Sequence, residues 1–334
     1  MKIATVSHSH IARRQQLFFE EVAKQGHQVL MISPGEWYGL RAKAYNRLSW
    51  GSSNEILSFR TCKHIGDNVY TYRLLGAKDL IEDFNPDWLY VQAEPGSVLA
   101  GEALSWKVDK RALFTWENLS IKGEGAFQLP KYDLVVCGNP DAVELVTSHN
   151  DKTALMLQVG VDTNHFQARP NVIRNIEVAY VGRPAPEKGL PYLTQAWPTV
   201  RVLEWKDFLD LPWWYSQIEV VVAFSQDTPL WREQAPNYVV LEALSCGCEA
   251  VISDTAAMKY WLEGCPGVVV VEGHRQGDNK FHIERIMRLK EGIFKALYWL
   301  GNKRGVNERG RTWVINNFSN VAMAKRLLGV LENA

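Results

Sequence analysis

The chain has 334 residues, of which 46% are apolar and 22% charged, and its 37 basic residues balance its 37 acidic ones. The length predicts two domains with separate cores, and the balanced charge argues against a general nucleic-acid-binding protein. No apolar run approaches the roughly 20 residues of a transmembrane helix, and we expect no signal peptide because the first residues already read as a strand.

The first part of the chain alternates between strands and helices. An apolar run at residues 2–7 predicts a buried strand, helical spacing follows at 13–25, and residues 29–32 predict a second strand. Strand, helix and parallel strand in this order form a βαβ unit. Further strands are expected at 88–91, 112–115 and 134–137, with helices between them, which predicts a parallel sheet covered on both faces.

The same alternation starts again in the second part of the chain. Strands are expected at 178–181, 200–203, 220–224, 250–253 and 268–271, and helices at 190–197, 236–246 and 321–331. The polar segment 164–175 separates the two parts, so we predict a first domain over 1–163 and a second over 164–314. In open α/β sheets ligands bind at the carboxyl ends of the strands, so a two-domain ligand-binding protein with a cleft is expected.

The five cysteines show no disulfide or zinc pattern. Their number is odd, and Cys246 and Cys248 are separated by one residue, whereas redox and zinc-binding pairs have two between them. We therefore expect reduced, mostly buried cysteines in a cytoplasmic protein.

A loop with two cations follows the strand at 178–181. Gly182 lets the backbone approach a ligand closely, and Arg183 and Lys188 can pair with phosphate oxygens. Cations fixed at this place would stabilise the charge that builds up on a departing diphosphate. A loop with ordinary surface charges is the alternative interpretation.

A second segment of interest lies before and within the helix expected at 236–246. The helix begins near Asn237, so its first backbone N–H groups suit a phosphate or a sugar hydroxyl. Glu242 lies among apolar neighbours, so its carboxylate requires hydrogen-bonding partners, such as the two hydroxyls of a ribose. Glu233 and Gln234, just before the helix, are candidates to hold hydroxyls of a transferred sugar.

Four segments together resemble the retaining glycosyltransferases of family 4, which have the two-Rossmann-domain GT-B architecture. The similar segments are "EEVAKQGHQVLMISP", "QVGVDTNHFQARP", "VGRPAPEKGLPYL" and "WREQAPNYVVLEALSCGCEAVISD", in this order and over nearly the whole chain. The resemblance implies two doubly wound α/β domains facing a cleft, with a C-terminal helix, 315–334, that crosses back to the first domain.

The resemblance also implies roles for individual residues. Arg183 and Lys188 would bind the donor diphosphate, Glu233 would contact the donor sugar, and Glu242 would hold the nucleotide ribose. The remaining donor contacts would come from Gly182, Gln234, Asn237, Tyr238 and Val239. Family members usually have two glutamates seven residues apart, which would place the first at Gln234, so either Gln234 takes the role or the loop carries one extra residue.

The resemblance implies that the acceptor-binding residues lie in the first domain. His8 and His10 follow its first strand, and Glu94 and Glu117 follow later ones, so all four are expected near the carboxyl edge of that sheet. Either carboxylate could orient an acceptor hydroxyl. The basic and aromatic stretch from Glu36 to Lys63 is either a surface for an anionic or lipid-linked acceptor at a membrane or a solvated loop.

The sequence contains no Asp-x-Asp triplet and no metal-ligand cluster, so no cofactor or metal is expected. The predicted function is a retaining, metal-independent transfer of a sugar from a UDP-, GDP- or ADP-linked donor to a saccharide, glycan or lipid hydroxyl. A sugar-nucleotide epimerase of the same fold and a non-catalytic nucleotide-sugar-binding protein remain alternatives. A nicotinamide dehydrogenase is disfavoured because no G-x-G-x-x-G follows either first strand.

Overall fold

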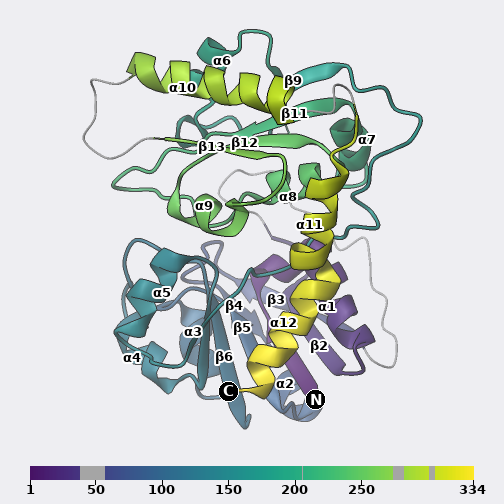
Figure 1. The fold of residues 1–334 in the computed structure, drawn as a ribbon. Coiled ribbons are helices and arrows are strands. Elements are labelled where there is room, and N and C mark those ends of the chain that lie inside the picture. The colour runs from purple at the N-terminus through teal and green to yellow at the C-terminus, as the bar shows by residue number, and fades with distance from the viewer. Residues whose placement is uncertain (38–56, 205, 274–281, 301–304) are drawn as a thin grey trace. The chain divides into compact units, whose positions relative to one another are not determined.

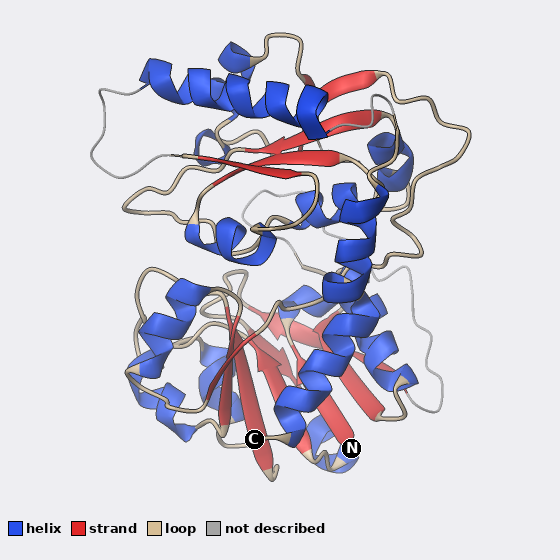
Figure 2. Cartoon of the chain, in the orientation of Figure 1, coloured by secondary structure: helices blue, strands red, loops and turns tan. Residues whose placement is uncertain are grey.

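The computed structural model describes the whole chain except residues 38–56, 205, 274–281 and 301–304. Its contacts divide the chain into two compact units, which we describe separately (Figures 1 and 2). Unit 1 comprises Met1–Gly160 and Asn320–Ala334, and unit 2 comprises Val161–Ser319. Most of the segment expected to receive an anionic acceptor, residues 38–56, lies outside the described residues.

The core of unit 1 is an eight-stranded sheet in the order β4-β3-β2-β1-β5-β6-β7-β8. Its neighbouring strands are parallel, except that β4 pairs antiparallel with β3 and so departs from the expected all-parallel arrangement. The apolar runs that predicted strands form its buried centre. The strands are β1 Lys2–Val6, β2 Gln28–Pro34, β3 Leu57–Ile65, β4 Arg73–Leu75, β5 Trp88–Gln92, β6 Lys110–Thr115, β7 Leu134–Cys137 and β8 Thr153–Leu155.

Helices cover the unit 1 sheet. The first helix buries Phe18, Phe19 and Val22, and the C-terminal helix α12 packs beside it (Figure 1). The short 3-10 helix η1 spans His8–Ile11 directly after β1. The α-helices of unit 1 are α1 Arg13–Lys24, α2 Ala77–Phe84, α3 Val98–Ala103, α4 Gly125–Gln128, α5 Pro140–Thr147 and α12 Asn320–Glu332.

Unit 2 is built on a five-stranded parallel sheet in the order β10-β9-β11-β12-β13. Figure 1 shows α10 lying across one face of this sheet, with α8 and α9 on the other. Its strands are β9 Ile176–Val181, β10 Arg201–Leu203, β11 Ile218–Ala223, β12 Glu249–Ser253 and β13 Val268–Val271. Its helices are η3 Pro186–Lys188, α6 Leu190–Ala196, α7 Leu211–Ser216, α8 Tyr238–Ser245, α9 Ala256–Leu262, α10 His282–Lys295, the π-helical turn η4 Ala296–Leu300 and α11 Glu308–Phe318.

Local pairing sets the boundaries between the two units. The Val161 amide donates a hydrogen bond of 2.7 Å to the carbonyl of Phe318, so the chain already belongs to unit 2 at Val161 rather than at residue 164. At the other end α11 continues to Phe318 within unit 2, and the chain returns to unit 1 only with α12 at Asn320.

All five cysteines are buried and free. Among the helices that the structure describes, none combines the length and the apolar character needed to cross a bilayer.

Candidate functional site

Two loops meet at the carboxyl edge of the unit 2 sheet. One follows β9 and carries Gly182, Arg183 and Lys188, and the other follows β11 and leads into α8. Because β9 and β11 are neighbours in the sheet, their loops emerge side by side. The Gln226 amide of the second loop donates a 2.8 Å hydrogen bond to the carbonyl of Glu187 in the first.

Gly189 determines how closely the two loops approach. Its φ is +70°, and a Cβ atom at this position would lie 2.0 Å from the carbonyl oxygen of Phe224, the residue just after β11. Only glycine fits both the left-handed conformation and this contact. The glycine therefore places Lys188, its predecessor, against the second loop.

Lys188 is held by two side chains of the second loop. Its Nζ lies 2.6 Å from Oε2 of Glu233 and 4.8 Å from the centre of the Trp231 ring. The same Glu233 oxygen accepts a 2.6 Å hydrogen bond from the hydroxyl of Ser225. Glu233 is buried and Gln234 is exposed, so it is Glu233 that meets the cation.

Arg183 is paired within its own loop. Its Nη2 donates a 2.7 Å bond to Oε1 of Glu187, and both side chains are about three-quarters buried. A hydrogen bond to its own backbone amide, together with the charge of Arg183, lowers the pKa of Glu187. Gly182, with a φ of +134°, begins this loop. The two candidate diphosphate ligands, Arg183 and Lys188, therefore each contact one carboxylate.

Helix α8 begins at the same edge. Asn237, its N-cap residue, has a φ of +57°, and its carbonyl accepts the 2.8 Å bond from Val240 that opens the helix. Asparagine tolerates this conformation better than most residues. Tyr238 and Val239, both half-buried, form the first turn, where backbone N–H groups have no partner inside a helix.

Glu242 lies inside unit 2, 1% exposed, and accepts a 3.1 Å hydrogen bond from the hydroxyl of Tyr215 on α7. Tyr215 is therefore one of the hydrogen-bonding partners that this carboxylate requires among its apolar neighbours. Sequence reasoning missed this tyrosine, and the only signal for it was the aromatic run Trp213, Trp214, Tyr215 just before β11.

In unit 1 the two predicted carboxylates also follow neighbouring strands. Glu94, after β5, accepts hydrogen bonds from the Thr115 hydroxyl (2.5 Å) and from the amides of Trp116 (3.2 Å) and Glu117 (3.0 Å). Burial raises the pKa of Glu94 to about 7. The carboxylate therefore holds the loop after β6, and its protonation state changes near neutral pH.

Glu117 is the centre of a small charged cluster. It is 3% exposed, accepts a 2.5 Å hydrogen bond from the Tyr70 hydroxyl, and lies 3.6 Å from Nζ of Lys122. Burial and the hydrogen bond to Glu117 raise the pKa of Tyr70. Tyr70 and Lys122 were not expected at this edge from the sequence.

The two histidines have different surroundings. His8 is partly exposed, packs against Trp37 and Tyr72, and burial lowers its pKa to about 4. His10 is fully buried, with Nδ1 3.0 Å from the Ile32 carbonyl and Nε2 3.2 Å from the Thr5 hydroxyl. His10 therefore joins β1 to β2. It was expected to face an acceptor, but the structure places it inside unit 1.

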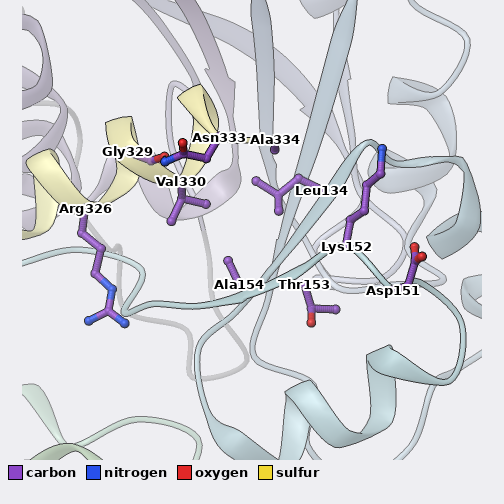
Figure 3. A pocket seen from close by; sticks show the side chains of 10 residues that line it. All are labelled: Leu134, Asp151, Lys152, Thr153, Ala154, Arg326, Gly329, Val330, Asn333 and Ala334. Carbon is purple, nitrogen blue, oxygen red and sulfur yellow. The ribbon is translucent and has the colours of Figure 1, made fainter.

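Unit 1 also has a groove of about 510 Å³ between β8 and α12 (Figure 3). The predicted site residues are not part of its lining, which includes Lys152, Thr153, Arg326 and Val330. Within the described part of the chain, no group of three or more His, Cys, Asp or Glu side chains is arranged to hold a metal ion.

No protein-family model matches the sequence, and no curated protein matches it. Solved structures do match over the full chain. A sucrose-phosphate synthase from Thermosynechococcus elongatus is 13% identical with a TM-score of 0.71, and the alignment covers 100% of this chain and 98% of that one. A glycosyltransferase from Rickettsia africae is 15% identical with a TM-score of 0.68, covering 100% and 99%.

A third similar structure is HepE from Anabaena in complex with UDP and glucose, 12% identical with a TM-score of 0.66 and full coverage of both chains. At such identities a structural likeness establishes the fold, while function depends on the site. The α/β fold expected from the sequence is confirmed, and this chain has the GT-B fold of these glycosyltransferases.

Proposed function

We propose that this protein is a retaining glycosyltransferase that takes a sugar from a nucleoside diphosphate donor bound by unit 2. The observation that carries the proposal is the placement of Arg183, Lys188 and the first turn of α8 at one edge of the sheet. Two cations and a helix N-terminus are the groups that bind a diphosphate without a metal ion. The similar HepE structures contain UDP, UDP-glucose, or UDP and glucose, which makes UDP-glucose the first donor to test.

The proposed chemistry follows from where charge develops. As the bond between sugar and diphosphate breaks, negative charge grows on the leaving phosphate, and the cations stabilise that charge more than they stabilise the ground state. Lys188 acts as a mobile point charge, whereas Arg183 offers two parallel N–H donors. An oxygen of the leaving diphosphate takes the proton of the incoming hydroxyl, so no further protein base is required.

Glu233 and Glu242 have separate roles in this proposal. Glu233 fixes Lys188 and offers its carboxylate to hydroxyls of the transferred sugar. Glu242, joined to Tyr215, accepts the hydrogen bonds of the nucleotide ribose. Donor binding requires that the two cations exchange part of their contact with Glu187 and Glu233 for phosphate oxygens.

The acceptor is proposed to be a hydroxyl of a saccharide, glycan or lipid that reaches unit 1 near His8, Glu94 and Glu117. These residues follow β1, β5 and β6, which are neighbours in the sheet. The five free cysteines fit a reducing compartment such as the cytoplasm.

Binding of UDP and UDP-glucose by isothermal titration calorimetry, followed by a transfer or donor-hydrolysis assay, tests the proposal. Lys188→Ala is expected to weaken UDP binding by about tenfold or more, because a hydrogen bond to a charged group contributes about 1.5–3 kcal/mol. Glu242→Gln is expected to weaken binding of UDP more than binding of pyrophosphate. Lys259→Ala, which removes an exposed lysine of α9, serves as the matched control.

Unchanged UDP affinity in both Lys188→Ala and Glu242→Gln would show that the donor site has been misplaced. Tight donor binding without transfer or hydrolysis would instead indicate a nucleotide-sugar-binding protein. Interconversion of the donor sugar without an acceptor would indicate an epimerase.

A further inference from the structure

The loop after β11 contains a tight turn that ends at Trp231. The Thr228 amide donates a 2.7 Å hydrogen bond to the Trp231 carbonyl, and the Trp231 amide donates one of 3.3 Å to the Thr228 carbonyl. Pro229, whose ring fixes its φ, and Leu230 form the tip between them. The turn therefore holds the backbone of Trp231 in one place.

This turn is also joined to its surroundings. The amide of Glu233 donates a 3.1 Å hydrogen bond to Oδ1 of Asp227, so the residues on either side of the turn are linked. Asp227 directly follows Gln226, whose amide is bonded to the loop after β9 that carries Lys188. The backbone of Trp231 and the loop that carries Lys188 are therefore fixed relative to each other.

The ammonium of Lys188 has two neighbours of different kinds. It lies 2.6 Å from the Glu233 carboxylate and 4.8 Å from the centre of the Trp231 ring, and the side chain is 21% exposed. The carboxylate neutralises the positive charge that a phosphate would need. The ring attracts the ammonium through its negative face and carries no net charge, so it does not compete with a phosphate.

Binding of a phosphate would exchange only one of these contacts. If Lys188 turns from Glu233 to a phosphate oxygen, the carboxylate keeps its 2.6 Å hydrogen bond from the Ser225 hydroxyl. The Trp231 ring can stay in contact with the ammonium, because an ammonium has three N–H donors and can meet a phosphate at the same time. A lysine released from both neighbours would have to be ordered by the ligand, at a cost in rotamer entropy.

We propose that Trp231 is a positioning residue whose ring holds the Lys188 ammonium at the carboxyl edge of the sheet while Glu233 gives way to a diphosphate oxygen. The inference rests on the function proposed above, in which Lys188 binds the donor diphosphate. Since the contact acts through Lys188, it concerns the phosphates alone. UDP and inorganic pyrophosphate should therefore depend on Trp231 to the same extent.

A double-mutant cycle between Trp231 and Lys188 tests the proposal. Calorimetry measures Kd for UDP and for pyrophosphate in the wild type, Trp231→Leu, Lys188→Met and the double variant. Trp231→Leu is expected to raise both Kd values about three- to tenfold, the range of a partly desolvated cation–π contact, and to change them less than about twofold once Lys188 is methionine. Trp231→Phe, which keeps an aromatic face, should lose less affinity than Trp231→Leu.

Two further measurements separate the ring from the turn and from the fold. Leu230→Ser, at the 89% exposed tip of the same turn, is the matched control and should bind UDP like the wild type. Fluorinated tryptophans at position 231 keep the shape of the ring but withdraw negative charge from its face, so the affinity for UDP should fall with each added fluorine. This series takes the place of Trp231→Leu should thermal melts show that variant to be unfolded.

The outcomes distinguish this inference from the proposed function. An equal loss from Trp231→Leu with and without Lys188, or an affinity that does not change across the fluorinated series, would overturn the role of Trp231 and leave the donor site in place. A loss in Leu230→Ser as large as that in Trp231→Leu would also overturn it, because the effect would then belong to the turn. A wild type that binds neither UDP nor pyrophosphate would overturn the donor site itself, and the role of Trp231 with it.

Discussion

In the loop that follows β9, Arg183 and Lys188 are each bonded to a carboxylate, and this pairing affects how tightly the loop can bind a phosphate. Arg183 contacts Glu187 at 2.7 Å, and Lys188 contacts Glu233 at 2.6 Å. A phosphate that arrives at Arg183 competes with a carboxylate four residues away. Glu187 either weakens donor binding as a competitor or strengthens it by orienting the guanidinium. We expect competition, because both side chains keep about a quarter of their surface exposed and the contact can open.

We predict that Glu187→Gln tightens UDP binding by about two- to fivefold, because a partly exposed ion pair is worth up to about 1 kcal/mol. Calorimetric titration with UDP measures the change. Glu263→Gln is the matched control, since Glu263 forms an ion pair of the same spacing with Lys259 on α9. Weaker binding in Glu187→Gln would show that Glu187 positions Arg183 instead.

The buried His10 leads to a second prediction at the residue scale, on how the stability of the protein depends on pH. Burial lowers its pKa to about 3, whereas an unfolded histidine titrates near 6.5. Because the folded pKa is depressed for a base, the unfolded chain takes up the proton first, and the contribution of His10 to stability is lost as the pH falls below 6.5. Glu94 and Glu249, whose burial raises their pKa to about 7, act in the opposite direction over the same range.

A comparison with His10→Gln cancels the effect of the two glutamates. The difference in unfolding free energy between wild type and His10→Gln should shrink by about 1.6 kcal/mol from pH 6.5 to pH 5, because over this range the unfolded histidine goes from half to almost full protonation while the folded one stays neutral. Urea unfolding at both pH values measures it. A constant difference would mean that His10 is already protonated in the folded protein at pH 5.

At the scale of secondary-structure elements, one buried arginine joins three of them in unit 2. Arg174, just before β9, is 5% exposed and donates hydrogen bonds to the carbonyl of Ile218 at the start of β11 and to that of Cys246 at the end of α8, the latter at 2.7 Å. Both carbonyls lie where regular hydrogen bonding ends. The arginine thus satisfies acceptors that β11 and α8 leave open.

We predict that Arg174→Met lowers the free energy of unfolding by about 2–4 kcal/mol, because two buried carbonyls lose a charged donor. Guanidinium unfolding followed by circular dichroism measures the loss. Arg169→Met, at an exposed arginine of the same segment, should change stability by less than about 0.5 kcal/mol. Equal losses of stability in the two variants would show that the buried hydrogen bonds of Arg174 contribute no more than an exposed arginine does.

Elements with a uniformly apolar pattern were predictable, whereas elements of mixed composition were not. β7 was expected at 134–137 and is found at Leu134–Cys137, because all four residues are apolar and buried. β3 was missed because polar residues such as Arg60 and Lys63 interrupt it, as happens in strands toward the margin of a sheet. β4, three residues long, gives no periodic signal at all.

At the scale of the whole molecule, the chain leaves unit 1 once and comes back with its last helix. Leu327 and Met323 of α12 are buried, and α12 packs against α1 of unit 1. The stability of unit 1 therefore depends on residues that follow the whole of unit 2 in the sequence. Unit 1 cannot complete its fold until the end of the chain is available.

Leu327→Ala is expected to destabilise unit 1 by about 2–5 kcal/mol, the usual cost of a large-to-small substitution in a core. Hydrogen exchange of unit 1 amides should increase accordingly, while UDP affinity of unit 2, measured at a temperature where both units are folded, should not change. Val321→Ala, at a 43% exposed residue of the same helix, is the control. Loss of UDP binding in Leu327→Ala would show that donor binding by unit 2 depends on the packing of unit 1.

The sequence by itself determined the alternation of strands and helices, the presence of two domains and the chemical types available at each strand end. These follow from local apolar patterns, glycines and charges, which do not depend on distant parts of the chain. Only the tertiary structure decided that Glu233 rather than Gln234 meets Lys188, that Tyr215 meets Glu242, and that His10 lies inside. Each of these facts depends on which strands become neighbours, and that choice results from packing between residues far apart in the sequence.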